Sequence, residues 1–208
     1  MPTTIVDHPL VAQRLAGIRD ETTPRPEFRR LLDELSHLLV YEACRTLPTD
    51  DVTVTTPLAP APAKVVSQPP LLVPVLRAGL GMLDGALKLV PESAVGFVGL
   101  KRDEETLQPD AYVTTVPEDL QGLGVIVLDP MLATGGSLIH TAKLLQAANC
   151  GPMTVVCVLA APEGLEAFAA AGFADVHVVT AAVDERLNEV GFIVPGLGDA
   201  GDRQFGVA

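Results

Sequence analysis

The stretch from residue 124 to residue 137 constrains the fold of this chain more than any other. It reads Gly-Val-Ile-Val-Leu-Asp-Pro-Met-Leu-Ala-Thr-Gly-Gly-Ser. The apolar residues 125–128 form a short run without charge, which predicts a strand buried on both faces, as in a parallel sheet. Asp129 follows at the carboxyl end of that strand, where open α/β sheets bind their ligands.

The rest of this stretch has the composition of a phosphate-binding turn. Pro130 ends the hydrogen bonding of the strand, and a helical pattern of apolar residues begins after Ser137. Thr134 or Ser137 can cap that helix. Gly135 and Gly136 allow backbone amides to converge beside the positive end of the helix dipole. A plain strand-to-helix turn would look similar, so the loop alone favours neither interpretation.

Composition limits the class of protein. The chain has 208 residues, 48% hydrophobic and 19% charged, which fits one domain with a sizeable core. It contains neither 18 consecutive apolar residues nor a signal-peptide pattern, so we expect no membrane partner and a cytoplasmic location. Three cysteines without a C-x-x-C pair indicate buried free thiols. A net charge of −12 argues against a nucleic-acid partner, and any phosphate site must be cationic locally.

From residue 71 onward, strand and helix patterns alternate. Strand patterns cover residues 71–76, 94–100, 125–128, 153–159 and 176–180, and helix patterns cover about 80–90, the residues after 137, and 162–171. This alternation predicts an α/β fold, with an open, mostly parallel twisted sheet and helices on both faces.

The flanking segments are predicted to form arms or a small hood over the carboxyl edge of the sheet. A short extended arm and two helices precede an edge strand at 51–58 and a proline-rich surface connector at 57–70. Glycine, proline and aspartate dominate residues 195–203, which predicts a loop built for close backbone approach. The predicted division of the single domain 1–208 is an N-terminal arm and helices (1–70), a core sheet (71–180), and a hood and tail (181–208).

Ionisable residues follow three of the predicted strands: Arg77, then Lys101 with Arg102, then Asp129. Side chains at the carboxyl ends of neighbouring parallel strands meet in one crevice. Arginine there suits bidentate capture of phosphate oxygens, and Asp129 suits ribose hydroxyls or a metal-bound water. One arginine alone would be interpreted as a surface ion pair. Together with the glycine-rich turn, these residues favour a site for a phosphorylated ligand.

Four longer motifs cover most of the chain. They are Val73-Pro-Val-Leu-Arg-Ala-Gly-Leu-Gly-Met-Leu-Asp-Gly85, Arg102-Asp-Glu-Glu-Thr-Leu107, residues 129–137, and Leu187-Asn-Glu-Val-Gly-Phe-Ile-Val-Pro-Gly-Leu-Gly-Asp-Ala-Gly-Asp202. In that order they resemble the pyrophosphate loop, the flexible hood, the ribose-5-phosphate loop and the uracil-binding end of uracil phosphoribosyltransferases, of the type I phosphoribosyltransferase superfamily. The start of the chain, His8-Pro-Leu10, fits this family too.

The resemblance implies a pentosyltransferase of pyrimidine salvage. Such an enzyme converts uracil and 5-phospho-α-D-ribose 1-diphosphate (PRPP) to UMP and diphosphate, with Mg²⁺ as its cofactor. The Mg²⁺ ion would be held mainly through the diphosphate, with no direct protein ligand assigned. The resemblance also implies a homodimer or higher homo-oligomer, and GTP as an effector in some members, for which the sequence shows no site.

Carried over by position, the resemblance gives roles to individual residues. The catalytic residues would be Asp199, Arg102 and Asp129. PRPP would be bound by Arg77, Arg102, Asp129, Pro130, Met131, Leu132, Ala133, Thr134, Gly135, Gly136, Ser137 and Asp199. Uracil would be bound by Ile193, Gly198, Asp199 and Ala200, largely through backbone groups. Asp202 is interpreted as a structural turn acid.

One departure and two alternatives remain. Residues 114–115 are both threonine where family members often carry a hood lysine, so a hood contact to phosphate is either missing or supplied by Lys101. An RNA-binding pyrimidine attenuation regulator with residual phosphoribosyltransferase activity would need a basic face, against which the net charge argues. A phosphoribosyltransferase for another base is disfavoured by the segment 193–202.

Overall fold

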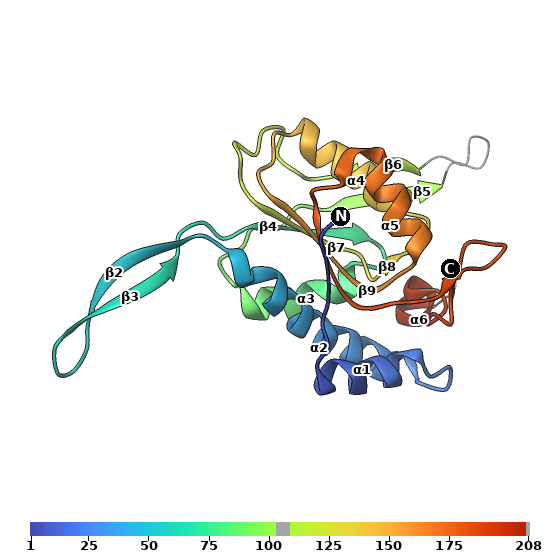
Figure 1. Cartoon of the computed structure of the whole chain (residues 1–208), viewed down its shortest axis with the longest axis horizontal. Coiled ribbons are helices and arrows are strands. Elements are labelled where there is room, and N and C mark those ends of the chain that lie inside the picture. The colour runs from blue at the N-terminus through green and yellow to red at the C-terminus, as the bar shows by residue number, and fades with distance from the viewer. Residues whose placement is uncertain (103–108, 207–208) are drawn as a thin grey trace.

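A predominantly parallel sheet forms the centre of the molecule (Figure 1). The computed structural model describes residues 1–102 and 109–206, and within these the sheet has eight strands. Their order is β1-β10-β9-β7-β4-β5-β6, with β8 beside β9. Their bounds are β1 Thr3–Ile5, β4 Leu71–Leu76, β5 Val98–Arg102, β6 Pro109–Thr114, β7 Val125–Leu128, β8 Met131–Leu132, β9 Met153–Ala160 and β10 His177–Val183. Neighbouring strands run parallel except β6, which is antiparallel to β5.

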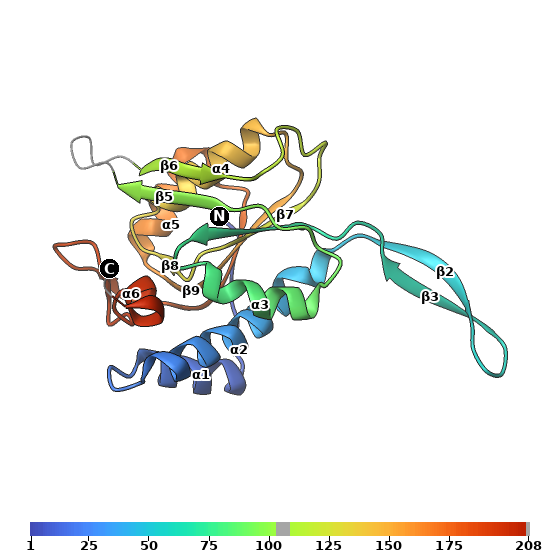
Figure 2. The same ribbon diagram turned by 180° about the vertical axis from the view of Figure 1, so that it is seen from behind.

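Helices cover both faces of this sheet, as the alternating pattern predicted. On one face lie α1 Pro9–Arg19, α2 Arg25–Ala43 and α3 Leu80–Leu89, and on the other lie α4 Gly136–Ala147 and α5 Pro162–Phe168 (Figures 1 and 2). A 3-10 turn, Cys44–Thr46, follows α2, and a π-turn, Ala169–Phe173, follows α5. In the part of the chain that the structure describes, no helix is both long and apolar enough to span a membrane.

The central strands are buried on both faces. Leu72 and Ile126 pack in the hydrophobic cluster under α1, α2 and α3. Their strand neighbours Val73 and Val127 point the other way and pack in the cluster under α4 and α5. Because successive side chains of a strand alternate between faces, an uninterrupted apolar strand serves both clusters. The prediction of a doubly covered strand at 125–128 is therefore confirmed.

The proline-rich stretch 57–70 contains a strand, so the prediction of a plain connector is wrong. β2, Thr49–Thr55, and β3, Pro60–Val66, pair antiparallel in a hairpin that projects from the amino edge of the sheet (Figures 1 and 2). Pro60 and Pro62 occupy alternate positions, so their missing N–H groups fall on one side of β3. An outer edge tolerates this loss of donors. Nearly every residue of the hairpin is exposed or half-buried.

The prediction that the flanking segments form arms or a hood is wrong for α1 and α2. Phe28, Leu32 and Leu35 of α2 are fully buried and belong to the core under the sheet. The sequence predicts a helix in this region, but the surface that the helix covers is set by the tertiary fold. Before α1, β1 adds a parallel strand beside β10 at the edge of the sheet.

The C-terminal segment is loop only in part, which corrects the prediction for residues 195–203. A short hairpin of β11, Arg186–Leu187, and β12, Ile193–Val194, leads into the loop. Helix α6, Ala200–Phe205, then begins inside the predicted loop, because the Asp199 carboxylate accepts a hydrogen bond from the Asp202 N–H at 2.8 Å. Gly196 and Gly198 keep positive φ angles of 65° and 80°, as a tight loop requires.

Candidate functional site

Three segments that are distant in sequence line one cavity of about 330 Å³ at the carboxyl edge of the sheet. The end of β4 contributes Ala78, the region after β7 contributes Asp129, Met131 and Ala133, and the C-terminal segment contributes Val190, Gly191, Phe192, Ile193, Gly198, Asp199, Ala200 and Gly201. A concave site of this volume suits a small molecule. We call it the carboxyl-edge cavity.

Several residues predicted to bind ligand are thus brought together, and others lie beside the cavity. Arg77 is exposed just after β4, and its guanidinium nitrogen lies 3.9 Å from a carboxylate oxygen of Asp202. Pro130 and Leu132 are buried, whereas Thr134 and Ser137 are exposed. The side chains of Arg102 and Lys101, and the hood residues 103–108, lie outside the described residues.

Asp129 is the buried acid of the carboxyl-edge cavity, with 8% of its surface exposed. Burial raises the pKa of this carboxyl group to about 7, although the Met131 N–H, 3.4 Å from Oδ1, partly opposes the rise. Desolvation penalises the charged form of a buried acid. A ligand that donates hydrogen bonds to Asp129 would relieve this penalty, which is the behaviour expected of a ribose-binding carboxylate.

Residues 129–137, the phosphate loop, connect β7 to α4 with a short return to the sheet. After Pro130, β8 pairs with β9 over two residues, an interaction that the sequence did not predict. The N-cap of α4 is Gly135, with φ 83°, so the predicted side-chain cap from Thr134 or Ser137 is wrong. The N–H groups of the first turn of α4 therefore keep their capacity to bind an anion.

Helix α5 supports the phosphate loop from behind. A Cβ atom on Gly164 would lie 2.2 Å from the Ala133 carbonyl oxygen, so only glycine lets the helix approach this closely. The hairpin at residues 186–194 is tied to the same helix, because the Leu187 N–H donates to the Glu163 carboxylate at 2.9 Å. Nothing in the sequence pattern distinguished Gly164 from an ordinary helix residue.

A buried glutamine links two of the predicted binding segments. The Gln204 side chain, fully buried in α6, donates from Nε2 to the Ala78 carbonyl at 3.0 Å and to the Ala200 carbonyl at 2.8 Å. Its Oε1 occupies the space where a Cβ atom on Gly81 would lie. Gln204 thus joins the segment after β4 to the segment that carries Asp199.

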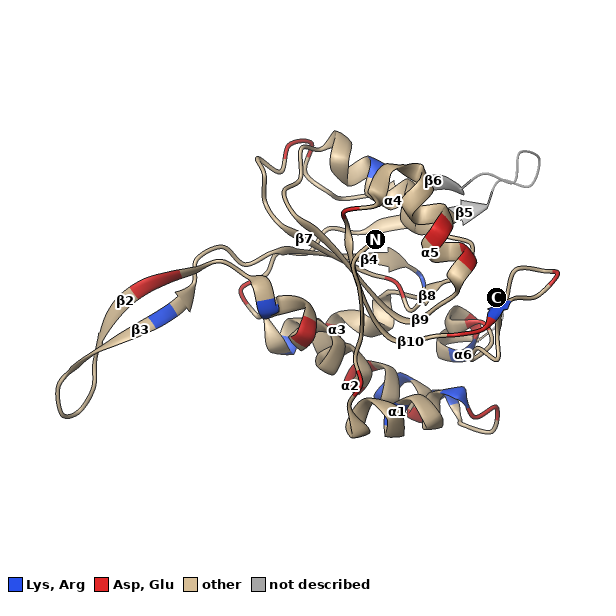
Figure 3. Ribbon diagram, in the orientation of Figure 1, with Lys and Arg blue, Asp and Glu red and all other residues tan. Residues whose placement is uncertain are grey.

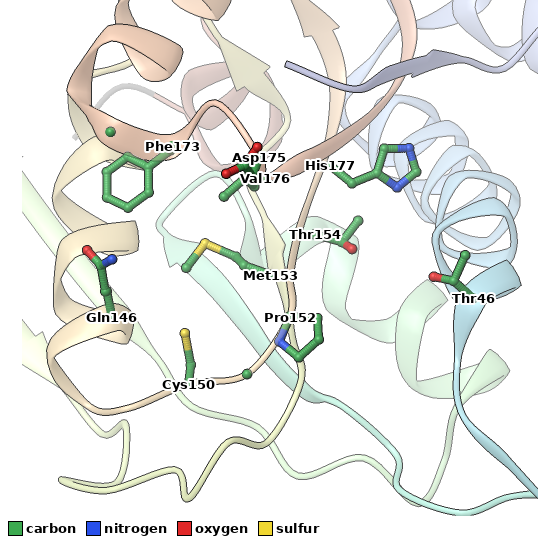
Figure 4. Close-up of a pocket in the computed structure, with 12 residues that line it drawn as sticks. Thr46, Gln146, Cys150, Pro152, Met153, Thr154, Phe173, Asp175, Val176 and His177 are labelled. Carbon is green, nitrogen blue, oxygen red and sulfur yellow. The ribbon is translucent and has the colours of Figure 1, made fainter.

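A second and larger cavity, of about 450 Å³, lies at the opposite, amino edge of the sheet (Figure 4). Gln146, Asp175 and His177 are among the polar side chains that line it. Its described lining includes an acid but neither lysine nor arginine, the side chains best suited to pair with phosphate. It also contains none of the predicted binding residues, and we therefore place the candidate site in the smaller cavity.

Charges of both signs are scattered over the described elements. Lysine and arginine segments alternate with acidic ones on several helices and on the projecting hairpin, without gathering on one described face (Figure 3). Among residues 1–102 and 109–206, no group of three or more His, Cys, Asp or Glu side chains could hold a metal ion. All three cysteines are free thiols, but only Cys157 is buried, whereas Cys44 and Cys150 are half-buried.

Known proteins with similar sequences share one description. The family model "Uracil phosphoribosyltransferase" matches residues 5–207. The chain is 56% identical over 207 residues to the uracil phosphoribosyltransferase of Streptomyces avermitilis, with 98% of each chain covered. It is 53% identical over 210 residues to that of Pseudarthrobacter chlorophenolicus, with 100% of each covered. The solved structure of the AQ2163 protein from Aquifex aeolicus is similar along 99% of both chains, with 39% identity and a TM-score of 0.90.

Proposed function

The chain belongs to the uracil phosphoribosyltransferase family, and from this we propose that it transfers the phosphoribosyl group of PRPP to N1 of uracil. The products are UMP and diphosphate. The observation that supports this most directly is the carboxyl-edge cavity, which joins Ala78, the phosphate loop and residues 198–201 around one space. These are the segments to which the family pattern assigns diphosphate, ribose phosphate and uracil.

We assign the two phosphate-bearing ends of PRPP to different parts of the site. The first turn of α4, after the left-handed Gly135, is suited to the 5-phosphate through its backbone N–H groups and the helix dipole. Arg77 and Arg102 are assigned to the diphosphate, which gains negative charge as the glycosidic bond breaks. Arginine near a leaving anion stabilises charge that develops in the transition state.

Asp129 and Asp199 are assigned to the ribose side of the reaction. Both carboxylates line the cavity, one buried and one exposed. As the bond to diphosphate breaks, positive charge grows on the sugar, and carboxylates nearby stabilise it. The N1 atom of uracil then forms the new bond to C1 of the ribose, and the N1 proton leaves to solvent or a base.

Uracil is assigned to the backbone of residues 193 and 198–200. The edge of uracil presents a carbonyl, an N–H and a second carbonyl, which a fixed loop can answer with an amide, a carbonyl and an amide. Cytosine would leave some of these groups unpaired, which is costly in a site built from hydrogen bonds. Positive φ angles at Gly196 and Gly198 allow the chain to turn this closely around a planar base.

Mg²⁺ fits this site as a partner of the substrate. The described residues offer separate acids around the cavity but no cluster of three ligands, and Mg²⁺ characteristically binds one or two carboxylates together with substrate phosphates. Asp129 and Asp199 are the residues that would stand beside the ion. When bound, the ion neutralises charge on the diphosphate.

Self-association and effector binding extend the proposal. The β2–β3 hairpin has few contacts with its own chain, and isolated two-stranded hairpins are marginally stable in water, which supports a homodimer or larger homo-oligomer. A GTP effector is implied by the family alone. The amino-edge cavity gives it no support, because its described lining holds no lysine or arginine. Free thiols are consistent with the proposed cytoplasmic location.

A base panel tests the proposed function. Purified protein is incubated with PRPP, Mg²⁺ and either uracil, cytosine, hypoxanthine or orotate, and the nucleotide product and diphosphate are quantified. We expect UMP from uracil, with cytosine slower by on the order of 10⁴ in kcat/KM. Comparable turnover of another base, or no turnover of uracil, would overturn the proposal.

A further inference from the structure

We propose that Asp184 and Arg19 are positioning residues that hold the C-terminal loop, residues 195–199, in the conformation that reads the base. Neither side chain lines the carboxyl-edge cavity. Both act on the backbone that leads to it. The inference rests on the proposed function, because it assigns a role within uracil binding.

Asp184 and Arg19 form a two-pronged ion pair beneath this loop. Asp184 directly follows β10, and its side chain is 5% exposed. The Arg19 guanidinium at the end of α1 donates to both carboxylate oxygens, with Nη2 at 2.6 Å from Oδ1 and Nη1 at 2.8 Å from Oδ2. Parallel bonds of this kind fix the orientation of both groups.

The same ion pair also forms hydrogen bonds with both peptide groups of Gly196. The Gly196 N–H donates to Asp184 Oδ2 at 2.8 Å, and the Gly196 carbonyl accepts from Arg19 Nη1 at 2.8 Å. Gly196 has φ 65°, and a Cβ atom there would lie 2.1 Å from the Ile193 carbonyl oxygen. The loop is therefore held, by two ionised side chains, in a conformation that favours glycine.

The position of Gly196 explains why these hydrogen bonds affect the binding of the base. Gly196 lies between Ile193 and residues 198–200, which form the two ends of the proposed uracil contact. Rotation of either Gly196 peptide would move both ends relative to each other. A site that binds a base through backbone groups cannot re-aim its hydrogen bonds by changing side-chain rotamers. Its selectivity therefore depends on the rigidity of that backbone.

A second arginine holds the next residue of the loop. Arg203 of α6 donates from Nη1 to the Leu197 carbonyl at 3.0 Å, and its guanidinium carbon lies 4.5 Å from the ring centroid of Phe28. Arg203 also bonds the Ile18 carbonyl, next to Arg19. The end of α1 and the C-terminal loop are thus joined at two successive residues.

Asp184 remains charged despite its burial. Desolvation acts to raise the pKa of this carboxyl group, but hydrogen bonds from Arg19 and from the Gly196 N–H outweigh it, and the pKa is lowered. Asparagine at position 184 keeps one acceptor and a similar shape while losing the charge. It therefore removes the two-pronged pair without leaving a cavity.

The chain offers a matched control pair. Arg14, five residues earlier in α1, bonds Glu34 of α2 at 2.9 Å, and both side chains are partly buried. This pair joins α1 to the core as the Arg19 pair does, but neither partner bonds the C-terminal loop. Arg14→Met measures the effect of loosening α1 alone.

The experiment compares steady-state kinetics of wild type, Asp184→Asn, Arg19→Lys and Arg14→Met, with melting temperatures recorded for each. In Asp184→Asn we expect the KM for uracil to rise roughly 10- to 100-fold, because small misplacements of a binding group have effects of this size. The KM for PRPP should rise less, because Asp199 is the only residue of this loop that we assign to PRPP. Arg19→Lys keeps the positive charge but cannot form two parallel hydrogen bonds, and it should give a smaller rise in the KM for uracil. Arg14→Met should leave both KM values unchanged.

An unchanged uracil KM in folded Asp184→Asn would overturn the inference. Equal rises in the uracil and PRPP values would also overturn it, because they would indicate a general loosening of the fold. If Asp184→Asn does not fold, the selective rise in Arg19→Lys decides the question. Wild-type protein that does not convert uracil would instead count against the proposed function, so the two failures are distinguishable.

Discussion

At the scale of single residues, the site holds two acids with opposite environments. Asp129 is buried, and its pKa is raised to about 7, whereas Asp199 is exposed and caps α6. The buried acid resists ionisation until a ligand donates a hydrogen bond to it. The exposed acid lies at the surface of the cavity, where it can stabilise positive charge that develops on the sugar. Each environment leads to a separate prediction.

The raised pKa of Asp129 makes the stability of the ligand-free protein depend on pH. The folded-state pKa of about 7 lies above the ordinary value of 3.8, so the stabilising effect of the protonated form is complete below about pH 4 and disappears as pH rises through 7. Asp129→Asn should therefore be more stable than wild type at pH 8, by on the order of 4 kcal/mol, and similar at pH 4. Denaturant unfolding at both pH values measures this. A stability difference that does not change with pH would contradict it.

Asp199→Asn separates the charge of Asp199 from its capping role. Asparagine caps helices as well as aspartate does, so α6 and the melting temperature should be preserved. The kcat should fall by roughly 10²- to 10³-fold if the carboxylate stabilises charge on the sugar. Asp202→Asn is the control, although Asp202 lies near Arg77. A larger loss of kcat in Asp202→Asn than in Asp199→Asn would reverse these assignments.

At the scale of elements, the phosphate loop owes its shape to helices on either side of it. Gly135 starts α4 in the left-handed region, and Gly164 lets α5 approach the Ala133 carbonyl. The sequence predicted the strand, the turn and the helix because each pattern is local. It missed the contact of Gly164 and the pairing of β8 with β9, because both depend on where another element lies.

Gly164→Ala tests the support from α5. The added methyl group would lie 2.2 Å from the Ala133 carbonyl oxygen, so the phosphate loop must shift. We expect the KM for PRPP to rise about tenfold or more while the KM for uracil changes little. Gly124→Ala is the matched control, because a methyl group there finds its nearest neighbour at 3.6 Å. Equal kinetics in the two variants would show that α5 does not set the loop.

Local composition led to wrong predictions at two other elements, β3 and α6. Prolines at 60 and 62 indicated a connector, yet an outer strand has no need of their N–H groups. Glycines at 196, 198 and 201 indicated a loop throughout, yet Asp199 supplies the hydrogen bond that starts α6.

The ion pair of Arg19 and Asp184 joins residues that are 165 positions apart in the sequence, so no local pattern predicts it. Asp184 directly follows β10, but the strand predicted there ends at residue 180, so no local pattern marked this acid.

At the scale of the whole molecule, the proposed ligand site and the projecting hairpin lie at opposite edges of the sheet. The residues that we propose to bind ligand gather at the carboxyl edge, where open α/β sheets bind their ligands. The β2–β3 hairpin projects from the amino edge, away from the site (Figure 2). This separation allows the proposed subunit association to be altered without touching the groups that we propose to bind ligand.

Replacement of residues 50–65 by a short glycine-serine turn tests the proposed association. The wild-type protein should elute as a dimer or larger species in size-exclusion chromatography with light scattering, and the shortened protein should lose mass per particle. The core should still fold, because the hairpin contributes no residue to either buried cluster. Monomeric wild-type protein, or an unchanged assembly after shortening, would refute the role of the hairpin.

A crystal structure of the protein with UMP would show directly whether the distant segments form one site. We predict that UMP occupies the carboxyl-edge cavity, with its 5′-phosphate on the first turn of α4, its ribose beside Asp129, and its uracil edge against the backbone of residues 193 and 198–200. UMP bound in the amino-edge cavity, or with its base turned away from residues 198–200, would contradict the central claim that these distant segments form one phosphoribosyltransferase site.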